Sequence, residues 1–363
     1  MSTHHTTASP VLSDDRSQNL FGKPLAELRS IVSQLGYPAF RGRQLAEWLY
    51  RRNLYAFAAC TSLSKRDRAE LASRFTIARS PPTAVHVSKD GTKKYLFTGA
   101  SGAVEAAYIP DSGRATLCLS TQIGCRWECR FCWTGRQGLQ QNLSTAEILS
   151  QLSELPERVH VTNVVFMGMG EPLDNFEATR DAIEILTAEY GYGIGAGRLT
   201  VSTVGMLPEL QYLLEQTRVR VALSVHSPFA EERAALMPVE RHYPLAEILK
   251  TLQHDPRFTT RRRSVEYLVF GGSNDTDRHA RALAQVARRI EARVNLIAVH
   301  GRKPGGPTEN RAGAPGGFGP RLRALQTFCE RLGSYGARVT VRRSRGEDIA
   351  AACGMLHTKR PPG

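Results

Sequence analysis

Long hydrophobic runs are missing from this chain of 363 residues. No apolar stretch approaches the roughly 20 residues that a membrane-spanning helix needs. The first twenty residues also lack the apolar segment of a signal peptide. We therefore expect a cytoplasmic protein without a membrane partner. The 41% of hydrophobic residues are nevertheless enough to build a full core.

Acidic residues are scarce relative to basic ones. The chain has 34 Asp and Glu against 48 Lys and Arg, a formal net charge of +14, which indicates a polyanionic partner. Between Phe21 and Pro81, eleven basic residues minus four acidic ones leave a surplus of seven, half of the total. This surplus favours a phosphate-binding module, and the alternative is an ordinary solvated helical surface. The basic residues are Lys23, Arg29, Arg41, Arg43, Arg51, Arg52, Lys65, Arg66, Arg68, Arg74 and Arg79.

Cysteines are few, seven in all, and in a reducing compartment they are more often ligands or catalysts than disulfide partners. Cys125, Cys129 and Cys132 form a C-x3-C-x2-C pattern with no fourth cysteine close behind. Because Fe–S clusters normally take four cysteines, three predict a [4Fe–4S] cluster with one iron left open. A structural zinc site, which lacks a nearby fourth ligand, and plain loop cysteines are the alternatives.

Apolar periodicity divides the chain into five segments. Residues 1–20 are polar and aperiodic, so we expect a disordered tail. Helical spacing over 21–85 predicts a small basic RNA-binding domain, and short strands over 86–115 predict a small β extension. Residues 116–300 alternate between strands and helices. Residues 301–363 begin with a Gly/Pro-rich loop over 301–320, followed by a final helix, a strand and a loop that carries Cys353.

The alternation over 116–300 is typical of parallel strands joined by crossover helices. We expect strands at 116–120, 160–167, 198–203, 219–225, 264–270 and 294–299, and helices at 144–155, 176–188, 207–216, 245–253 and 275–290. Six such units predict an α/β fold with a partial (β/α)6 TIM-like barrel. Ser144 and Glu147 fit a capping box at the first helix.

Active-site groups of parallel α/β barrels gather at the C-terminal ends of the strands. The three-cysteine loop follows the first strand, and the most distinctive polar residues occupy later strand ends. A single serine or glycine there is more often structural, but the shared position favours one site. The residues are Gly170, Glu171, Ser202, Ser224, His226 and His300.

These motifs resemble the radical S-adenosylmethionine superfamily and, within it, the RlmN/Cfr family of RNA adenine methyltransferases. The resemblance extends over residues 22–356 in the segments CLSTQIGCRWECRFCWTGRQGLQQNL, VVFMGMGEPLDN, TVSTVGMLP, ALSVHSP, VEYLVF and RGEDIAAACG. It implies that Cys125, Cys129 and Cys132 ligate a [4Fe–4S] cluster. It also implies that S-adenosylmethionine is held by Gly170, Glu171, Ser202, Ser224, Val225, His226 and His300.

The same resemblance implies that Cys353 carries a methyl group, that Cys118 resolves the product and that Glu105 is the general base. An electron-poor adenine carbon has no lone pair with which to attack a sulfonium methyl, whereas a thiolate can attack it. A tether between Cys353 and RNA would then need a second thiolate, which frees the product and leaves a transient disulfide. Taken singly, Cys118 also fits a buried strand thiol, Cys353 an inert helix cap and Glu105 a surface carboxylate.

The resemblance implies methylation of an adenosine in 23S ribosomal RNA at carbon 2, with transfer RNA as a second candidate substrate. Methylation at carbon 8, which protects ribosomes from antibiotics, is the alternative. A radical enzyme acting on another substrate and a zinc-containing RNA-binding protein are further hypotheses. We expect a monomer that receives electrons from a donor such as flavodoxin or ferredoxin.

Three features depart from the family pattern. His300 stands where the family usually has an asparagine that contacts the cofactor, and Trp133 replaces a smaller residue after the last cluster cysteine. The Gly301–Pro320 loop is also atypical. Arg345 and Asp348 fit either of two roles, in RNA contact or in shaping the Cys353 loop.

Overall fold

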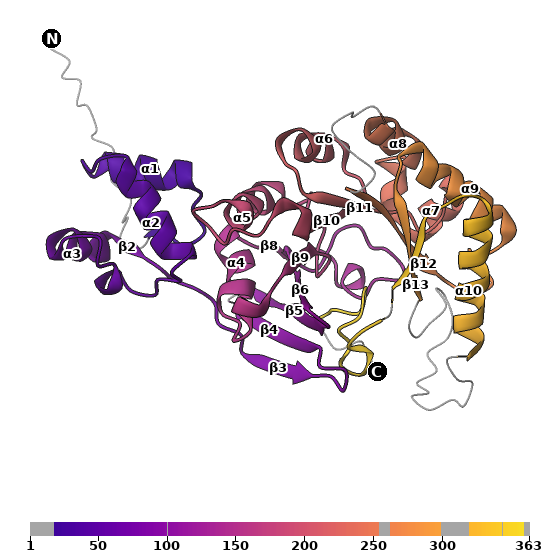
Figure 1. Ribbon diagram of the computed structural model, residues 1–363, viewed down its shortest axis with the longest axis horizontal. Coiled ribbons are helices and arrows are strands. Elements are labelled where there is room, and N and C mark those ends of the chain that lie inside the picture. The colour runs from indigo at the N-terminus through magenta and orange to yellow at the C-terminus, as the bar shows by residue number, and fades with distance from the viewer. Residues whose placement is uncertain (1–17, 100, 254–261, 299–318, 343, 359–363) are drawn as a thin grey trace, which may run out of the picture.

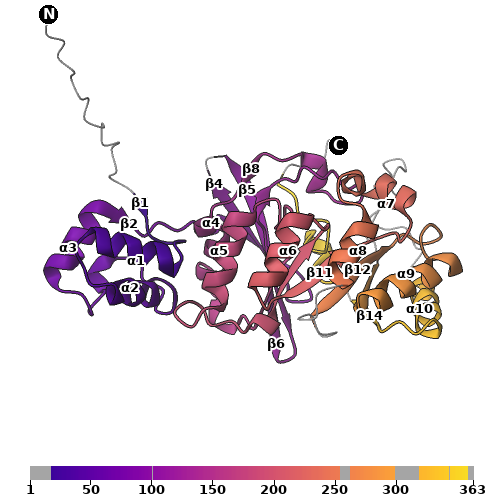
Figure 2. The same ribbon diagram turned by 90° about the horizontal axis from the view of Figure 1, so that it is seen from above.

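A helical domain occupies one end of the elongated molecule (Figures 1 and 2). The computed structural model describes residues 18–99, 101–253, 262–298, 319–342 and 344–358. The domain contains α1 (Leu25–Gln34), α2 (Phe40–Tyr50), a short 3-10 turn (Phe57–Ala59) and α3 (Lys65–Arg74), closed by the parallel pair β1 (Gln18–Asn19) and β2 (Phe75–Thr76). The predicted tail over 1–20 is therefore wrong for its last residues, because Gln18 and Asn19 form β1 and Leu20 is fully buried.

The helical domain packs against the rest of the protein through aromatic residues and one close backbone contact. The rings of Tyr50 and Tyr190 lie 6.4 Å apart, and the Tyr190 hydroxyl accepts a hydrogen bond from the backbone N–H of Leu25 at 3.2 Å. Gly22 lies so close to α4 (Thr145–Ser153) that a Cβ atom there would be 2.6 Å from the backbone nitrogen of Ala146. The first helical segment is thus fixed to the first barrel helix.

Ten strands form one sheet in the order β14-β13-β12-β11-β10-β9-β6-β5-β4-β3. The strands from β6 to β14 are parallel, and β3, β4 and β5 extend the sheet by antiparallel pairing. The six predicted barrel strands are confirmed, with β14 as a seventh parallel strand. Their bounds are β3 (Ala84–Val87), β4 (Lys93–Gly99), β5 (Gly102–Asp111), β6 (Arg114–Leu119), β9 (Asn163–Phe166), β10 (Leu199–Thr203), β11 (Arg220–Ser224), β12 (Arg263–Val269), β13 (Arg293–Ala298) and β14 (Val339–Arg342).

Helices follow the parallel strands and cover one face of the sheet (Figures 1 and 2). Ser144 caps α4 through a complete capping box with Glu147, as predicted. In the described ranges no helix is long and apolar enough to cross a membrane. The helices after α4 are α5 (Phe176–Thr187), α6 (Leu207–Gln216), α7 (Ala230–Leu236), α8 (Leu245–Gln253), α9 (Asp277–Arg289) and α10 (Gly319–Ser334).

Alternation along each strand separates an apolar face from a polar one. Leu117, Leu119, Val164 and Phe166 are almost fully buried in the main hydrophobic core. The residues between them, such as Cys118, point to the opposite face. That face carries the serines, carboxylates and thiol that the sequence singled out.

The structure differs from the predicted segments in three places. The β extension expected over 86–115 begins at Ala84 and belongs to the barrel sheet, because β5 pairs with β6. The short helix α7 was not predicted. A two-stranded pair, β7 (Gln122–Ile123) and β8 (Gln141–Asn142), was also missed, and it closes the three-cysteine loop.

We expect Gly22→Ala to destabilise the protein more than Gly36→Ala. Both glycines have positive φ, +96° and +78°, but a Cβ atom at Gly36 meets nothing within 4 Å. Left-handed backbone costs other residues about 1–2 kcal/mol, and the added clash with α4 should cost Gly22→Ala about 1–3 kcal/mol more. Urea unfolding of both variants measures the difference, and equal losses would contradict the close packing of Gly22 on α4.

Candidate active site

The three-cysteine loop leaves the sheet after β6 and is closed by β7 and β8. Its closure requires glycine at position 124, where φ is +79° and a Cβ atom would lie 1.7 Å from the carbonyl oxygen of Gly138. The backbone N–H of Cys125 donates to that same carbonyl at 3.2 Å. The loop is therefore a tight ring that is closed directly before its first cysteine.

The three thiols share a sheltered environment. Cys129 is buried, and Cys125 and Cys132 are half-buried. Burial, and next the neighbouring cysteines, raise the pKa of Cys129 well above its ordinary value, while the Arg233 cation opposes this shift. In the described part of the chain no group of three His, Cys, Asp or Glu side chains lies close enough to hold a single metal ion. The donor set, three thiols on one ring near a buried cation, fits an iron–sulfur cluster with one thiolate per ligated iron.

Arg233 on α7 is a functional candidate that the sequence analysis missed. Its side chain is fully buried and forms an ion pair with Glu240. It donates to the carbonyl oxygens of Val204 at 2.9 Å and Ser224 at 3.2 Å. The cation thus links the ends of β10 and β11, and its charge acts on the Cys129 thiol of the cluster loop. No sequence signal marked it, because an arginine in a short polar helix usually faces solvent.

Gly170 and Glu171 follow β9 and pack against the start of the cluster loop. A Cβ atom at Gly170 would lie 2.5 Å from the Cβ of Gln122, and the backbone N–H of Glu171 donates to the Gln122 side chain at 2.8 Å. The carboxylate of Glu171 accepts from the backbone N–H groups of Val204 at 3.0 Å and Leu173 at 3.2 Å. Burial raises the pKa of Glu171 to about 7, so this carboxyl exchanges a proton near neutral pH.

The other predicted cofactor residues lie on neighbouring strand ends. Ser202 and Ser224 are half-buried on β10 and β11, and Val225 is fully buried. The ring of His226 packs edge-on against Phe131 of the cluster loop at 4.7 Å, and its Nδ1 accepts from the backbone N–H of Leu268 at 3.1 Å. Burial, assisted by Arg233, lowers the pKa of His226 to about 3. His226 is therefore a neutral ring with its proton on Nε2.

His300 lies outside the described residues, so the structure does not test its contact with the cofactor. Most of the Gly301–Pro320 loop is likewise outside them. Trp133 is described: its ring packs edge-on against His357 at 4.5 Å. This tryptophan thus supports the C-terminal segment that carries Cys353.

Cys118 and Glu105 lie on one face of the sheet, on adjacent strands. Cys118 on β6 is opposite Ala107 on β5, and Glu105 is two residues from Ala107 on the same face. Ala107 in turn is opposite Lys94 on β4. Register therefore brings a thiol, a carboxylate and an ammonium group into one row across three strands.

The C-terminal segment 351–358 crosses this row and the cluster loop. The backbone N–H of Trp133 donates to the carbonyl of Gly354 at 2.9 Å, and the Thr134 hydroxyl donates to the carbonyl of Leu356 at 2.7 Å. The backbone N–H of His357 donates to Oε2 of Glu105 at 2.9 Å. These bonds attach the residues that directly follow Cys353 to the cluster loop and to the general-base candidate.

Cys353 and Cys118 are electrostatic neighbours. Ala351 packs in one small cluster with Ala107 and Cys118. Burial, and next the nearby Cys353, raise the pKa of Cys118 to about 12, whereas Arg342 acts in the opposite direction. Cys353 as a residue is exposed to solvent, whereas burial of its thiol raises the pKa of that group as well. All seven cysteines are free, so the structure contains no disulfide.

Hydrogen bonds of Arg345 and Asp348 favour one of the two roles considered for them, that of shaping the Cys353 loop. Asp348 accepts from the Ser88 hydroxyl at 2.5 Å and from the backbone N–H of Lys89 at 3.1 Å. Arg345 donates to the carbonyl of Pro110 at 2.6 Å. Although burial opposes its ionisation, hydrogen bonds from Thr92 and from the backbone of Gly346 lower the pKa of Asp90 to about 2. The turn between β3 and β4 therefore anchors the loop.

The basic surplus of the helical domain divides into exposed and buried residues. Arg79, counted with the phosphate-binding residues, is instead structural: its guanidinium is buried and donates to the carbonyls of Leu49 at 3.0 Å and Leu54 at 2.8 Å. Arg52 lies over the ring of Trp48 at 4.6 Å, and Phe40 is 56% exposed. The exposed basic residues are Arg29, Arg43, Arg51, Arg52, Lys65, Arg66 and Arg74.

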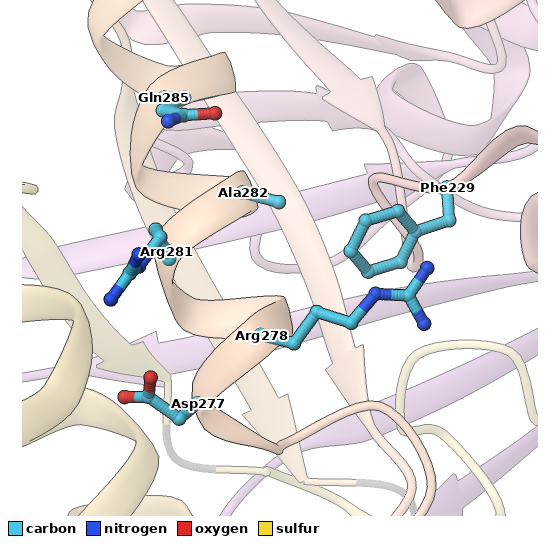
Figure 3. A pocket seen from close by; sticks show the side chains of 6 residues that line it. All are labelled: Phe229, Asp277, Arg278, Arg281, Ala282 and Gln285. Carbon is cyan, nitrogen blue, oxygen red and sulfur yellow. The ribbon is translucent and has the colours of Figure 1, made fainter.

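A separate hollow of about 380 Å³ lies between Phe229 and the start of α9 (Figure 3). Its lining contains none of the predicted site residues. The guanidinium of Arg278 already lies 3.7 Å from the centre of the Phe229 ring and 3.4 Å from the Glu232 carboxylate. Because the charge of Arg278 is already compensated, the hollow is a weaker candidate for the active site than the row formed by Cys118, Glu105 and Lys94.

Comparisons with known proteins agree with this geometry. Residues 119–291 match the family model of the radical SAM superfamily, and residues 18–77 match that of the ribosomal RNA large subunit methyltransferase N-terminal domain. A probable dual-specificity RNA methyltransferase RlmN of Bacteroides fragilis is 43% identical over 93% of this chain and 96% of its own length. The corresponding protein of Porphyromonas gingivalis is 44% identical over 94% and 97%. A radical SAM methyltransferase from Sphaerobacter thermophilus superimposes with a TM-score of 0.81 at 36% identity, covering 94% of this chain and all of that one.

Proposed function

The chain belongs to the RlmN family of radical SAM RNA methyltransferases, and on that premise we propose that it methylates carbon 2 of an adenosine in 23S ribosomal RNA and in transfer RNA. The observation that carries this proposal is the position of Cys353. A solvent-exposed cysteine is held by backbone hydrogen bonds beside the cluster loop, next to a buried second thiol and a buried carboxylate. Simple methyl transfer to a nitrogen would need none of these.

The residues present fit the two cofactors that the family implies. Cys125, Cys129 and Cys132 would hold a [4Fe–4S] cluster, and Gly170, Glu171, Ser202, Ser224, Val225 and His226 would hold S-adenosylmethionine, with His300 as a further candidate. When bound, these groups supply a methyl group and a radical that can react at an electron-poor carbon. A one-electron donor such as flavodoxin or ferredoxin would serve a monomeric enzyme.

The chain's own residues then have separate tasks. Cys353 is the acceptor for the methyl group because it is the exposed cysteine residue beside the cluster loop. Glu105 takes the ring proton of the tethered adenine, since it is the buried carboxylate that contacts the Cys353 segment. The Cys118 thiolate attacks the Cys353 sulfur, the sulfur–carbon bond to the RNA breaks, and the released carbon takes up a proton, which frees the methylated RNA and leaves a Cys118–Cys353 disulfide. Because the pKa of Cys118 is raised, its thiol must first lose its proton to a base before the sulfur can attack.

The helical domain would bind the phosphates of the RNA. Its exposed arginines and lysines provide charge, and Phe40 and the Trp48–Arg52 pair provide flat surfaces on which unpaired bases stack. The target adenosine must leave its stack to reach Cys353.

Mass mapping of 23S ribosomal RNA and transfer RNA tests the proposed function directly. A strain that lacks the gene should lose one methyl group on an adenosine in both RNA classes, and the wild-type gene should restore it. A gene with Cys353→Ala should not. An unchanged adenosine in both RNAs would contradict the proposal, and a lost methyl group on carbon 8 would contradict the assigned position.

We expect Arg51→Gln/Arg52→Gln to weaken RNA binding without unfolding the protein, because both side chains are exposed on the helical domain. The dissociation constant should rise about tenfold, and the slope of log affinity against log salt should fall by about 1–2. Fluorescence anisotropy at several salt concentrations measures both.

Arg158→Gln/Arg198→Gln is the matched control for this experiment. It removes the same charge from exposed arginines at the opposite, N-terminal ends of β9 and β10. Equal weakening by the two double variants would mean that only net charge matters and that the helical domain has no special role.

A further inference from the structure

We propose that Lys94 is a positioning residue that keeps Glu105 ionised and aimed at the Cys353 segment. This inference rests on the proposed function and adds a residue to it. Lys94 lies on β4 and contacts no part of the cluster loop in the described hydrogen bonds and ion pairs. It acts through Glu105.

The pair is close, and both partners are buried. The Nζ atom of Lys94 lies 2.8 Å from Oε1 of Glu105, and the two side chains are 9% and 8% exposed. A lysine is rarely buried unless it is paired. Removing one partner of such a pair is costly because the remaining charge is left without compensation. The two charges therefore depend on each other.

The direction of each contact leaves the carboxylate able to work as a base. Oε1 of Glu105 accepts from Lys94, and Oε2 accepts from the backbone N–H of His357. A carboxylate has about four acceptor positions on its two oxygens, so both oxygens keep a free lone pair. When the C–H bond of the adenine breaks, its electron pair stays in the ring and the proton goes to one of these lone pairs.

An ammonium group at this distance favours the charged form of the carboxylate. Burial acts the other way, since it penalises an isolated charge. Without Lys94, Glu105 would be a buried carboxyl whose oxygens are held by one backbone N–H. Its negative charge would then have no compensating cation, which disfavours the ionised form that accepts the proton.

Other titratable groups lie around Glu105, on several different elements. Cys118 on β6 and Cys353 on the C-terminal segment are thiols, Arg342 on β14 is a cation near both, and His357 turns its Nδ1 to the carbonyl of Met355 at 2.9 Å. Glu171 turns to Val204 and Leu173. All of these remain in a Lys94 variant, so they cannot produce a difference between that variant and the wild type.

The experiment follows release of RNA from the Cys353 adduct as a function of pH. Holoenzyme is mixed with RNA in a single turnover, stopped after a fixed time between pH 4.5 and 9, and adduct and free product are separated on denaturing gels. In Lys94→Met the acidic limb of this profile, where release falls off with decreasing pH, should move up by about 1–2 units, as expected for loss of an opposite charge beside a carboxylate. Lys94→Arg, which keeps the charge, should stay within about 0.5 unit of the wild type.

Two further variants separate charge from structure. Lys94→Gln removes the charge and keeps a hydrogen-bond donor, so it should shift like Lys94→Met, and it decides the matter if Lys94→Met does not fold. Lys93→Met is the matched control, because Lys93 is the adjacent residue and pairs with Glu157 at 2.5 Å, away from Glu105. Its pH profile should equal that of the wild type.

A wild-type profile in both Lys94→Met and Lys94→Gln, with normal adduct formation, would overturn this inference alone. The same shift in Lys93→Met would also overturn it, since the effect would then come from general loss of charge on β4. Absence of any adduct in the wild type, and in a Cys118→Ala enzyme that cannot release it, would overturn the proposed function and this inference together.

Discussion

The site depends on the hydrogen bonds that tie segment 351–358 to the cluster loop and to Glu105. Trp133, Thr134 and Glu105 each bind the backbone of this segment. Without them Cys353 would have no fixed relation to the three thiols or to Cys118. The parallel sheet supplies the other half of the arrangement, because its strand ends bring the cofactor candidates to one edge.

The strength of this attachment suits a segment that must hold and release RNA. A neutral hydrogen bond contributes about 0.5–1.5 kcal/mol net and one to a charged group about 1.5–3 kcal/mol, so the two neutral bonds and the bond to Glu105 together contribute about 3–6 kcal/mol. That is enough to favour one position and small enough to permit local opening without global unfolding. Asp90 and Asp348 anchor the residues that precede the segment, so opening can be confined to the part around Cys353.

Much of the fold could be predicted from the sequence because its cause is local. Helices α6 and α8 have the predicted bounds, 207–216 and 245–253, since apolar spacing and flanking breakers determine them. The cysteine spacing likewise identified the cluster loop. By contrast, α7 is short and polar, and β1 and β2 have two residues each, so they depend on tertiary contacts that no local pattern reveals.

From the sequence, a site residue could be predicted only where its residue type alone indicates its chemical role. The cysteines and Glu171 stood out, but Lys94 and Arg233 did not, because their significance comes from burial and from partners that are distant in sequence. Lys94 meets Glu105 through antiparallel register, and Arg233 reaches Ser224 from a helix. Arg79 is a residue whose role was predicted wrongly. The local charge suggested that it contacts RNA, but the structure places its guanidinium inside the helical domain.

Controlled oxidation of the cluster-loaded protein tests the central claim, that segment 351–358 holds Cys353 within reach of Cys118. After brief anaerobic treatment with diamide, non-reducing peptide mapping should find a Cys118–Cys353 disulfide as the main product. Recovery of Cys118 as a free thiol, while Cys353 has formed disulfides with other partners, would contradict the account.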